Sequence, residues 1–457
     1  MDTQQMPSNS KPTKWFRETV LVKVVLIGVL TLLLLIPSNW IQGLIRERQN
    51  RQDEVMTEIS DKWSGSQLVE GPVMVLPYKT LVTQKDISGK ISYKEAITNI
   101  YVLPEMLNIN SNANPELLHR GIFDAVVYNT KIKVNGKFSP LELKKSGINP
   151  AMVQWDKTKI VIGLSDLKGL KNTPAIRLGN TTFNVEPDFS NIGLFSNNLV
   201  ILPDLNTDKN TALSFSFDLD LRGSSELSFQ HLGKNTNVTV TGKWNNPSFT
   251  GRYLPEKRRI SADAFSATWK IPSFNRSLPQ QWISEKTIMN TIKNDASFGV
   301  KFILPVDQYQ KTMRTAKYSV LIIMLTFVSL FFSELITKRE VHLLQYILIG
   351  AAMTIYYTLL LSFTEQVGFN LAYLIASVAT VTLISCFIAS LLKNKMPAII
   401  FGSILSILYG FIFVIIQLQD LALLFGSIGL FLVIAVVMYL SVKIDWSKKP
   451  AAEAQYS

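Results

Sequence analysis

Six long apolar runs, one near the N-terminus and five in a nearly continuous block from about residue 319 to residue 440, constrain this chain most. A helix of about 20 apolar residues crosses the hydrocarbon core of a bilayer and satisfies its own backbone hydrogen bonds there. The predicted spans are residues 20–36, 320–336, 343–363, 369–392, 398–417 and 421–442. The sequence therefore predicts an α-helical membrane protein with six spans, arranged as one plus five.

Basic residues occupy alternate gaps between these spans. The gaps with bases hold Lys11, Lys14 and Arg17, then Lys338 and Arg339, then Lys393 and Lys395, and finally Lys443, Lys448 and Lys449. The gaps around Glu365 and at residues 417–420 hold none. Because bases near span ends stay in the cytoplasm, both termini are expected there. The expected divisions are a cytoplasmic N-terminus (1–19), a transmembrane anchor (20–41), a periplasmic domain (42–318), a five-helix membrane block (319–442) and a cytoplasmic tail (443–457).

Two details of the first span need an account. Arg46, Arg48 and Arg51 follow it on the outer side, but long translocated domains cross largely regardless of charge. The span is followed by "PSNWIQ", which has no small-x-small cleavage pattern, so we expect an uncleaved anchor. Lys23 lies within the run and is expected to extend its ammonium to the inner headgroups.

The segment 42–318 is predicted to be β-rich and sandwich-like, since its apolar residues recur with period two. "ALSFSFDLDLRG" alternates strictly, and residues 237–244 and 264–271 alternate as well. An Asn-Gly pair at Asn135 and Gly136 predicts a hairpin turn. Helices are expected at "PELLHRG" and at both flanks, 48–63 and 307–318. Residues 129–140 resemble residues 235–247, which leaves open whether the domain contains two similar subdomains.

No catalytic, cofactor-binding or metal site is predicted. His119, His231 and His342 are far apart and none lies at metal-ligand spacing from another ligand residue. No GxSxG, HExxH or Walker pattern occurs. The one cysteine, Cys386, lies in an apolar run, so the exported domain is held without a disulfide. A periplasmic hydrolase would need a base and a nucleophile that converge only in space.

The exported domain is basic, with 35 Lys and Arg against 26 Asp and Glu in residues 42–318. This balance suggests anionic neighbours, namely lipid headgroups, an anionic envelope component or an envelope protein, and no nucleic-acid signature is present. The candidate contact residues are Arg222, Arg252, Lys257, Arg258 and Arg259, although an ordinary solvated turn is the alternative for this cluster. Trp244, Trp269 and Trp282 are expected in the core rather than in a groove.

Glu334 is the candidate functional residue of the membrane block. Acids inside spans are often functional, but this one lies near an interface with Lys338 one turn away. If the five-helix block transports ions or handles lipids, Glu334 is expected to be essential. If the block anchors the protein or relays a signal, it is not.

Several long segments resemble one known family. "RTAKYSVLIIMLTFVSLFFSELI", "HLLQYILIGAAMTIYYTLLLSFTEQVGFNLAYLIAS", "WNNPSFTGRYLPEKRRISADAFSATWKIPSFNRSLPQQW" and "SFGVKFILPVDQY" are similar to the CreD family of bacterial inner-membrane proteins. The resemblance implies the architecture predicted above and a role in cell envelope integrity and in responses to β-lactams or colicins. It implies no enzymatic activity and offers no catalytic residues. We expect a non-enzymatic multi-pass inner-membrane protein whose β domain binds an envelope partner, with a transporter or lipid-handling protein as the alternative. Its oligomeric state stays open.

Overall fold

The computed structural model describes residues 12–85, 91–143, 147–188, 194–205, 212–276, 278–283, 297–304, 308–337, 341–393, 395–418 and 421–443. The chain forms two compact units. One comprises Met1–Arg51 with Asp307–Ser457 and is called the membrane unit; the other is Gln52–Val306 and is called the β unit. The predicted division into a split helical part and one inserted β-rich part agrees with this architecture. Lys11, Lys338, Arg339, Lys448 and Lys449 lie outside the described residues.

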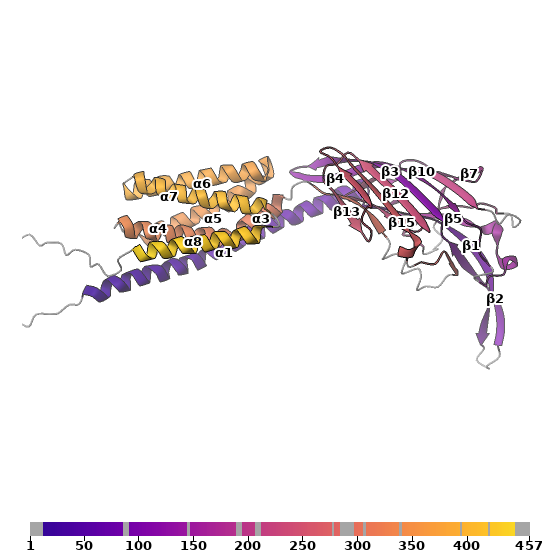
Figure 1. Ribbon diagram of the computed structural model, residues 1–457, viewed down its shortest axis with the longest axis horizontal. Helices are drawn as coiled ribbons and strands as arrows, with labels where there is room; N and C mark the ends of the chain where they lie inside the picture. Colours follow the sequence, from indigo (N-terminus) through magenta and orange to yellow (C-terminus); the bar gives the residue numbers. More distant parts are fainter. Residues whose placement is uncertain are drawn as a thin grey trace, which may run out of the picture. The chain divides into compact units, whose positions relative to one another are not determined.

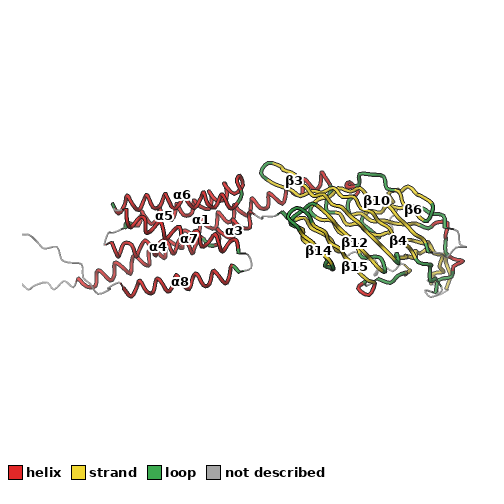
Figure 2. The backbone as a smooth tube through the Cα atoms, turned by 45° about the horizontal axis from the view of Figure 1, so that its top comes forward, coloured by secondary structure: helices red, strands yellow, loops and turns green. Residues whose placement is uncertain are grey.

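The membrane unit is built from apolar helices. They are α1 (Pro12–Trp63), α3 (Gln308–Lys317), α4 (Ser319–Thr337), α5 (Leu343–Val367), α6 (Phe369–Leu392), α7 (Lys395–Gln417) and α8 (Ala422–Lys443). Among the described residues, five helices are long and apolar enough to cross a membrane, and six spans result if α3 and α4 form one span bent by 41°. Figure 2 shows the helices of this unit running side by side. The one-plus-five arrangement is confirmed.

Polar contacts within the membrane unit show the relative direction of α1 and α4. Lys23 of α1 pairs with Glu334 near the end of α4, whereas Ser38 lies 2.6 Å from Ser319 at the start of α4 (Oγ to Oγ). The two helices are therefore antiparallel, as the alternation of bases requires. The predicted helical flanks are confirmed too, because α1 continues to Trp63 and α3 precedes α4.

The β unit consists of two mixed sheets (Figure 1). Among the described residues, the nine-stranded sheet has the order β13 (Pro247–Gly251), β17 (Ser297–Phe302), β11 (Glu226–Gln230), β1 (Gln67–Lys85), β5 (Lys159–Leu164), β9 (Asn197–Ile201) and β8 (Glu186–Asp188), with β2 (Ile91–Val102) on β1 and β16 (Gln281–Ile283) on β2. The eight-stranded sheet has the order β14 (Lys257–Ile260), β15 (Phe265–Pro272), β12 (Asn235–Gly242), β3 (Met106–Arg120), β4 (Phe123–Phe138), β10 (Leu213–Ser224), β6 (Ala175–Leu178) and β7 (Thr181–Asn184).

One apolar core lies between the sheets. Phe215, Phe217, Leu219 and Leu221 of β10 are buried and alternate with more exposed polar residues, which confirms the period-two prediction. Rings from opposite sheets meet there: the centroids of Trp269 and Phe298 are 5.5 Å apart. Trp269 is buried in this core and Trp244 packs against it, as expected, whereas Trp282 is buried in a second apolar cluster with Tyr101.

Two local predictions were wrong. "PELLHRG" is not helical but continues β3, which stays paired with β4 as far as Arg120. Asn135 and Gly136 form no turn and lie within β4. A Cβ on Gly136 would lie 2.1 Å from the carbonyl oxygen of Met106, so this glycine permits a close backbone approach.

The two segments that resemble one another lie in the same sheet rather than in two subdomains. They contribute β4 and β12, which flank β3 on either side. The similarity therefore reflects two strands of similar composition beside a shared neighbour.

Candidate functional site

The predicted basic cluster forms an exposed edge strand. Lys257, Arg258 and Arg259 belong to β14, which pairs with β15 at the end of the described sheet and has all four of its residues exposed. Lys257 lies opposite Thr268 and Arg259 opposite Ser266, so these two bases share the outer face of the eight-stranded sheet. No ion pair engages these three bases within the described part of the chain. Their charge is available to an anion, although bases on an edge strand also prevent unwanted strand pairing.

Arg252 precedes this strand in the chain and has a different setting. It follows β13, at the edge of the nine-stranded sheet, and its backbone N–H donates to the carbonyl oxygen of Ser297 at 2.9 Å. We define the basic patch as Arg252, Lys257, Arg258 and Arg259. The patch therefore has one member after the edge strand of the nine-stranded sheet and three on the edge strand of the eight-stranded sheet.

Arg222 has a structural setting instead. Its guanidinium carbon lies 5.3 Å from the ring centroid of Trp63, at the end of α1, and its Nη2 donates to the carbonyl oxygen of Lys168 at 3.3 Å. Nearby, Ser224 Oγ donates to Ser60 Oγ at 2.8 Å and Lys168 Nζ donates to the carbonyl oxygen of Asp61 at 2.9 Å. Arg222 therefore helps to fix the end of α1 to β10 rather than extending the basic patch.

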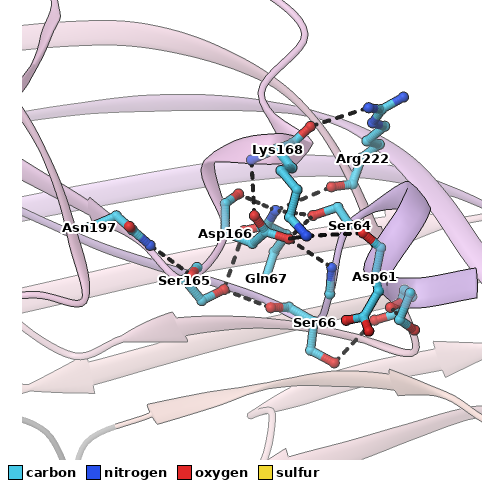
Figure 3. A network of polar contacts seen from close by, with 12 residues as sticks. Asp61, Ser64, Ser66, Gln67, Ser165, Asp166, Lys168, Asn197 and Arg222 are labelled. Atoms are coloured by element: carbon cyan, nitrogen blue, oxygen red, sulfur yellow. Dashed lines mark hydrogen bonds and ion pairs between the residues drawn. The ribbon is translucent and has the colours of Figure 1, made fainter. Parts of the chain in front are cut away.

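This arrangement is the edge of a larger polar network that we call the clasp (Figure 3). At its centre the buried Gln67 donates through Nε2 to Ser64 Oγ at 2.9 Å and to the carbonyl oxygen of Asp166 at 2.8 Å. The Asp166 carboxylate accepts from the backbone N–H groups of Gly65 and Lys168, at 3.1 and 2.9 Å. The clasp thus pairs the polar groups of Ser64, Gly65 and Gln67 where α1 ends and β1 begins, while the buried Trp63 Nε1 and Arg222 Nε have no hydrogen-bond partner among the described residues.

The clasp predicts a pH dependence. Burial alone would raise the pKa of Asp166, but hydrogen bonds from the backbone of Gly65 and Lys168 and from Ser64 outweigh it and lower the pKa. Because the folded pKa is depressed, this stabilisation is complete above the unfolded pKa and is lost as pH falls through the folded pKa. Asp166→Asn should cost about 1–3 kcal/mol of unfolding free energy at pH 7 and progressively less in acid.

The measurement is urea unfolding of the full chain in detergent, followed by tryptophan fluorescence at pH 7 and in acid. Asp156→Asn is the matched control, since Asp156 is exposed beside the nine-stranded sheet. An equal cost of Asp166→Asn at both pH values would contradict the assigned role of the carboxylate.

Glu334 is buried and paired. Its Oε1 lies 2.5 Å from Lys23 Nζ, and Tyr346 Oη of α5 donates to its Oε2 at 3.3 Å. Lys23 therefore forms an ion pair with Glu334 rather than only reaching for headgroups. The sequence signal for this pair is that the first apolar run contains a single base, Lys23, and the second contains a single acid, Glu334. The sequence alone did not show that these two residues are partners.

Polar residues also meet at the opposite end of the membrane unit, where the chain leaves it for the β unit. Glu365 accepts from Tyr309 Oη at 3.1 Å and lies 3.8 Å from Arg48 Nε. Lys311 Nζ donates to Gln417 Oε1 at 2.9 Å. Arg48, a base that ran against the sidedness rule, is thus matched by the acid of a base-free gap.

Four tyrosines gather inside the membrane unit between these two ends. Tyr356 and Tyr357 of α5, Tyr373 of α6 and Tyr409 of α7 are all buried. The ring centroids of Tyr356 and Tyr409 are 4.8 Å apart, and Tyr373 Oη donates to the carbonyl oxygen of Tyr409 at 2.7 Å. The hydroxyls of Tyr357 and Tyr409 have no partner among the described residues. This cluster links three helices, as expected of tyrosines deep in a bundle.

The histidines form no metal centre in the part of the chain that the structure describes, where no group of three or more His, Cys, Asp or Glu could hold an ion. His231 Nδ1 lies 2.9 Å from Thr236 Oγ1. Burial, and then the charge of Arg276, lower the pKa of His231 to about 4, so its side chain is neutral at physiological pH. Its surroundings are those of a core residue.

Two comparisons with known proteins give the same result. A family model described as "Inner membrane protein CreD" matches residues 19–447. The inner membrane protein CreD of Escherichia coli (strain K12) is 31% identical over 418 residues, which is 91% of this chain and 91% of that protein. The similarity extends from the first span to the end of the last helix and includes the whole β unit.

Proposed function

Since the chain belongs to the CreD family and is a multi-pass inner membrane protein, we propose that it supports cell envelope integrity without enzymatic activity. In this proposal the β unit lies in the periplasm and binds an anionic envelope component through the basic patch. The membrane unit anchors the β unit and relays its bound state. The resulting response would be the one that envelope stress from β-lactams or colicins requires.

The observation that carries this proposal is the exposed basic strand. Lys257, Arg258 and Arg259 project three charges from the edge of a sheet without a neutralising partner in the described part of the chain. Such a strand attracts anions at long range and can contact them directly.

The membrane unit is suited to anchoring. Two of its carboxylates have partners from other helices: Glu334 contacts Lys23 and Tyr346 at one end, and Glu365 contacts Arg48 and Tyr309 at the other. Such pairs fix helices to one another. The two unpartnered hydroxyls of Tyr357 and Tyr409 instead favour the alternative, in which the block forms a path for an ion or a lipid. The activity of stable Glu334 variants in cells distinguishes an anchoring block from one that forms a path.

The test of the basic patch is a triple substitution, Lys257→Ser with Arg258→Ser and Arg259→Ser, in the full chain expressed in cells that lack the protein. We expect protection against β-lactams and colicins to be lost while folding is unchanged, because substitutions of exposed residues usually shift stability by less than about 0.5 kcal/mol. Cell survival and protein abundance are measured together.

The matched control removes the same charge elsewhere, through Lys94→Ser, Lys157→Ser and Lys301→Ser. These three lysines are exposed and belong to the nine-stranded sheet or the segment packed beside it. Full protection by the triple variant of β14 would remove the basic patch from the proposal, and equal loss in the control would reduce the effect to net charge.

A further inference from the structure

A row of polar side chains crosses the outer face of the eight-stranded sheet. Strand register places opposite one another Arg177 of β6, Ser216 of β10, Asn135 of β4, Asn108 of β3, Asn237 of β12 and Lys270 of β15. We call these six residues the amide row. Five strand intervals of about 4.8 Å give it a length of roughly 24 Å. None of the six could have been grouped from the sequence, because they come from six separate strands.

The three asparagines of the row form a hydrogen-bonded ladder. Asn237 Nδ2 donates to Asn108 Oδ1 at 3.0 Å, and Asn108 Nδ2 donates to Asn135 Oδ1 at 3.1 Å. These bonds fix the orientation of each amide. Each side-chain amide has two donor hydrogens and two acceptor lone pairs, so the ladder leaves donors and acceptors of all three residues available.

One end of the row opens into a pocket of about 560 Å³. Its polar lining includes Asn108, Asn135, Lys137, Arg177, Asn180 and Ser216, Met106 and Phe215 add apolar surface, and no acid is among the described residues that line it. The volume falls in the usual range for small-molecule sites. A ligand bound there would meet two cations and several amides at once.

The face around the row is cationic. The described acids of this face on β3 and β10 all have polar or basic neighbours: Asp218 lies opposite Lys133, Asp220 lies 3.9 Å from Lys171, and Glu116 accepts from Asn129 Nδ2 at 3.3 Å. Lys257, opposite Thr268, ends the row of residues next to the amide row. Arg259, opposite Ser266, ends the row after that. The amide row therefore shares one face with Lys257 and Arg259 of the basic patch, with positive charge at both edges and amides in the middle.

This combination selects among polymers. Fixed amides offer adjacent donor and acceptor positions, which suit the neighbouring hydroxyls of a sugar ring, and the strand spacing is close to the length of one pyranose unit in an extended chain. Arg177 and Lys137 suit carboxylates. The row itself has no aromatic or aliphatic side chain, whereas protein contacts centre on aromatic anchors and acyl chains need apolar surface.

We propose that the amide row and its pocket bind an acidic glycan, a polyhydroxylated chain that carries carboxylates. The inference rests on the proposed function and deepens it by naming the class of the anionic component. The sugar hydroxyls lie against Asn108, Asn135 and Asn237, and a carboxylate enters the pocket between Arg177 and Lys137.

The test measures binding of fluorescently labelled oligogalacturonate to the full chain in detergent micelles by anisotropy. Wild type is expected to bind it well above a neutral dextran of the same length and above polyglutamate. Lys137→Ser with Arg177→Ser should weaken binding about tenfold, and Asn108→Ala with Asn135→Ala should do so by a similar factor without any change of charge. Lys94→Ser with Lys157→Ser, the charge-matched control, should leave it within about twofold.

Three results would overturn the inference in distinguishable ways. Polyglutamate bound as tightly as oligogalacturonate, with the asparagine variants unaffected, would reduce the site to a general polyanion surface and leave the proposed function intact. Loss confined to the triple variant of β14 would move the site to the basic patch. Failure of wild type to bind any of the polyanions would overturn both proposals. Unfolding temperatures of all variants show whether a loss reflects folding.

Discussion

Glu334→Gln is expected to destabilise the membrane unit by roughly 3 kcal/mol. The substitution leaves the Lys23 ammonium without a counter-charge at the helix interface and removes the charged acceptor of Tyr346. Breaking a buried ion pair from one side typically costs about 3–5 kcal/mol. We place the effect at the lower end because the Lys23 side chain is 32% exposed and can reach water when its partner is lost. Thermal unfolding in detergent and abundance in cells both report it.

The double substitution Lys23→Met with Glu334→Leu should recover most of that stability. Replacing both members of a buried pair by apolar residues of similar size is often neutral or stabilising. The double variant also separates the two functional readings. If the membrane unit anchors and relays, the stable double variant should protect cells as wild type does. If Glu334 takes part in ion or lipid passage, function should stay lost although the protein is stable.

Glu365→Gln serves as the comparison at the other end of the membrane unit. Glu365 also has a tyrosine and a basic partner, but its distance to Arg48 Nε is 3.8 Å and the Arg48 side chain is 46% exposed. Its loss should therefore cost less, about 1 kcal/mol or below. If Glu365→Gln and Glu334→Gln reduced stability equally, the Lys23–Glu334 ion pair would contribute no more to the membrane unit than the more exposed Arg48–Glu365 contact.

The membrane architecture could be predicted from sequence because its signals are long and mutually consistent. Length and apolarity define each span, and the bases define the order in which spans turn back. Contacts between spans could not be predicted in the same way. Lys23 and Glu334 are 311 residues apart, and only the antiparallel packing of α1 on α4 brings them together.

Local signals in the β unit failed where a neighbouring strand overrode them. Pro115 suggested a helix start, yet it lies in β3 beyond Ala113, where the pairing with β12 ends. One side of the strand is open at that point, so the missing N–H of proline is tolerated. Gly136 suggested a turn but instead accommodates the backbone of Met106. Pairing with a neighbouring strand determined the conformation of both segments, because strand formation depends more on tertiary context than on local propensity.

The candidate contact residues likewise differ in how far their setting could be predicted from the sequence. Lys257, Arg258 and Arg259 are adjacent in sequence, so they could be predicted as one exposed cluster. Arg222 could not be separated from them, because its contact with Trp63 depends on where α1 ends. The amide row depends on the register of six strands and has no sequence signature.

Labelling from outside the cell is expected to be all or none at two engineered cysteines. With Cys386→Ser as background, Phe274→Cys in the β unit should react with a membrane-impermeant maleimide in intact spheroplasts, since Phe274 is 97% exposed. Lys395→Cys, at the start of α7, should react only after the membrane is permeabilised. The physical reason is that bases near span ends remain in the cytoplasm, so the end of the membrane unit with Lys395 faces inward.

Each position serves as a control for the other. If the chain had the opposite orientation in the membrane, Lys395→Cys would react in intact spheroplasts and Phe274→Cys would not. The Cys386→Ser background without a new cysteine reports non-specific reaction. On this expectation, the end of the membrane unit with Lys23 and Glu334 faces inward, and the end with Arg48, Tyr309 and Glu365, where residues 52–306 are inserted in the chain, faces outward. Protection of Phe274→Cys together with reaction of Lys395→Cys would put the β unit in the cytoplasm. The basic patch and the amide row would then face cytoplasmic polyanions. The membrane would separate them from any periplasmic envelope component, and binding to such a component would be ruled out.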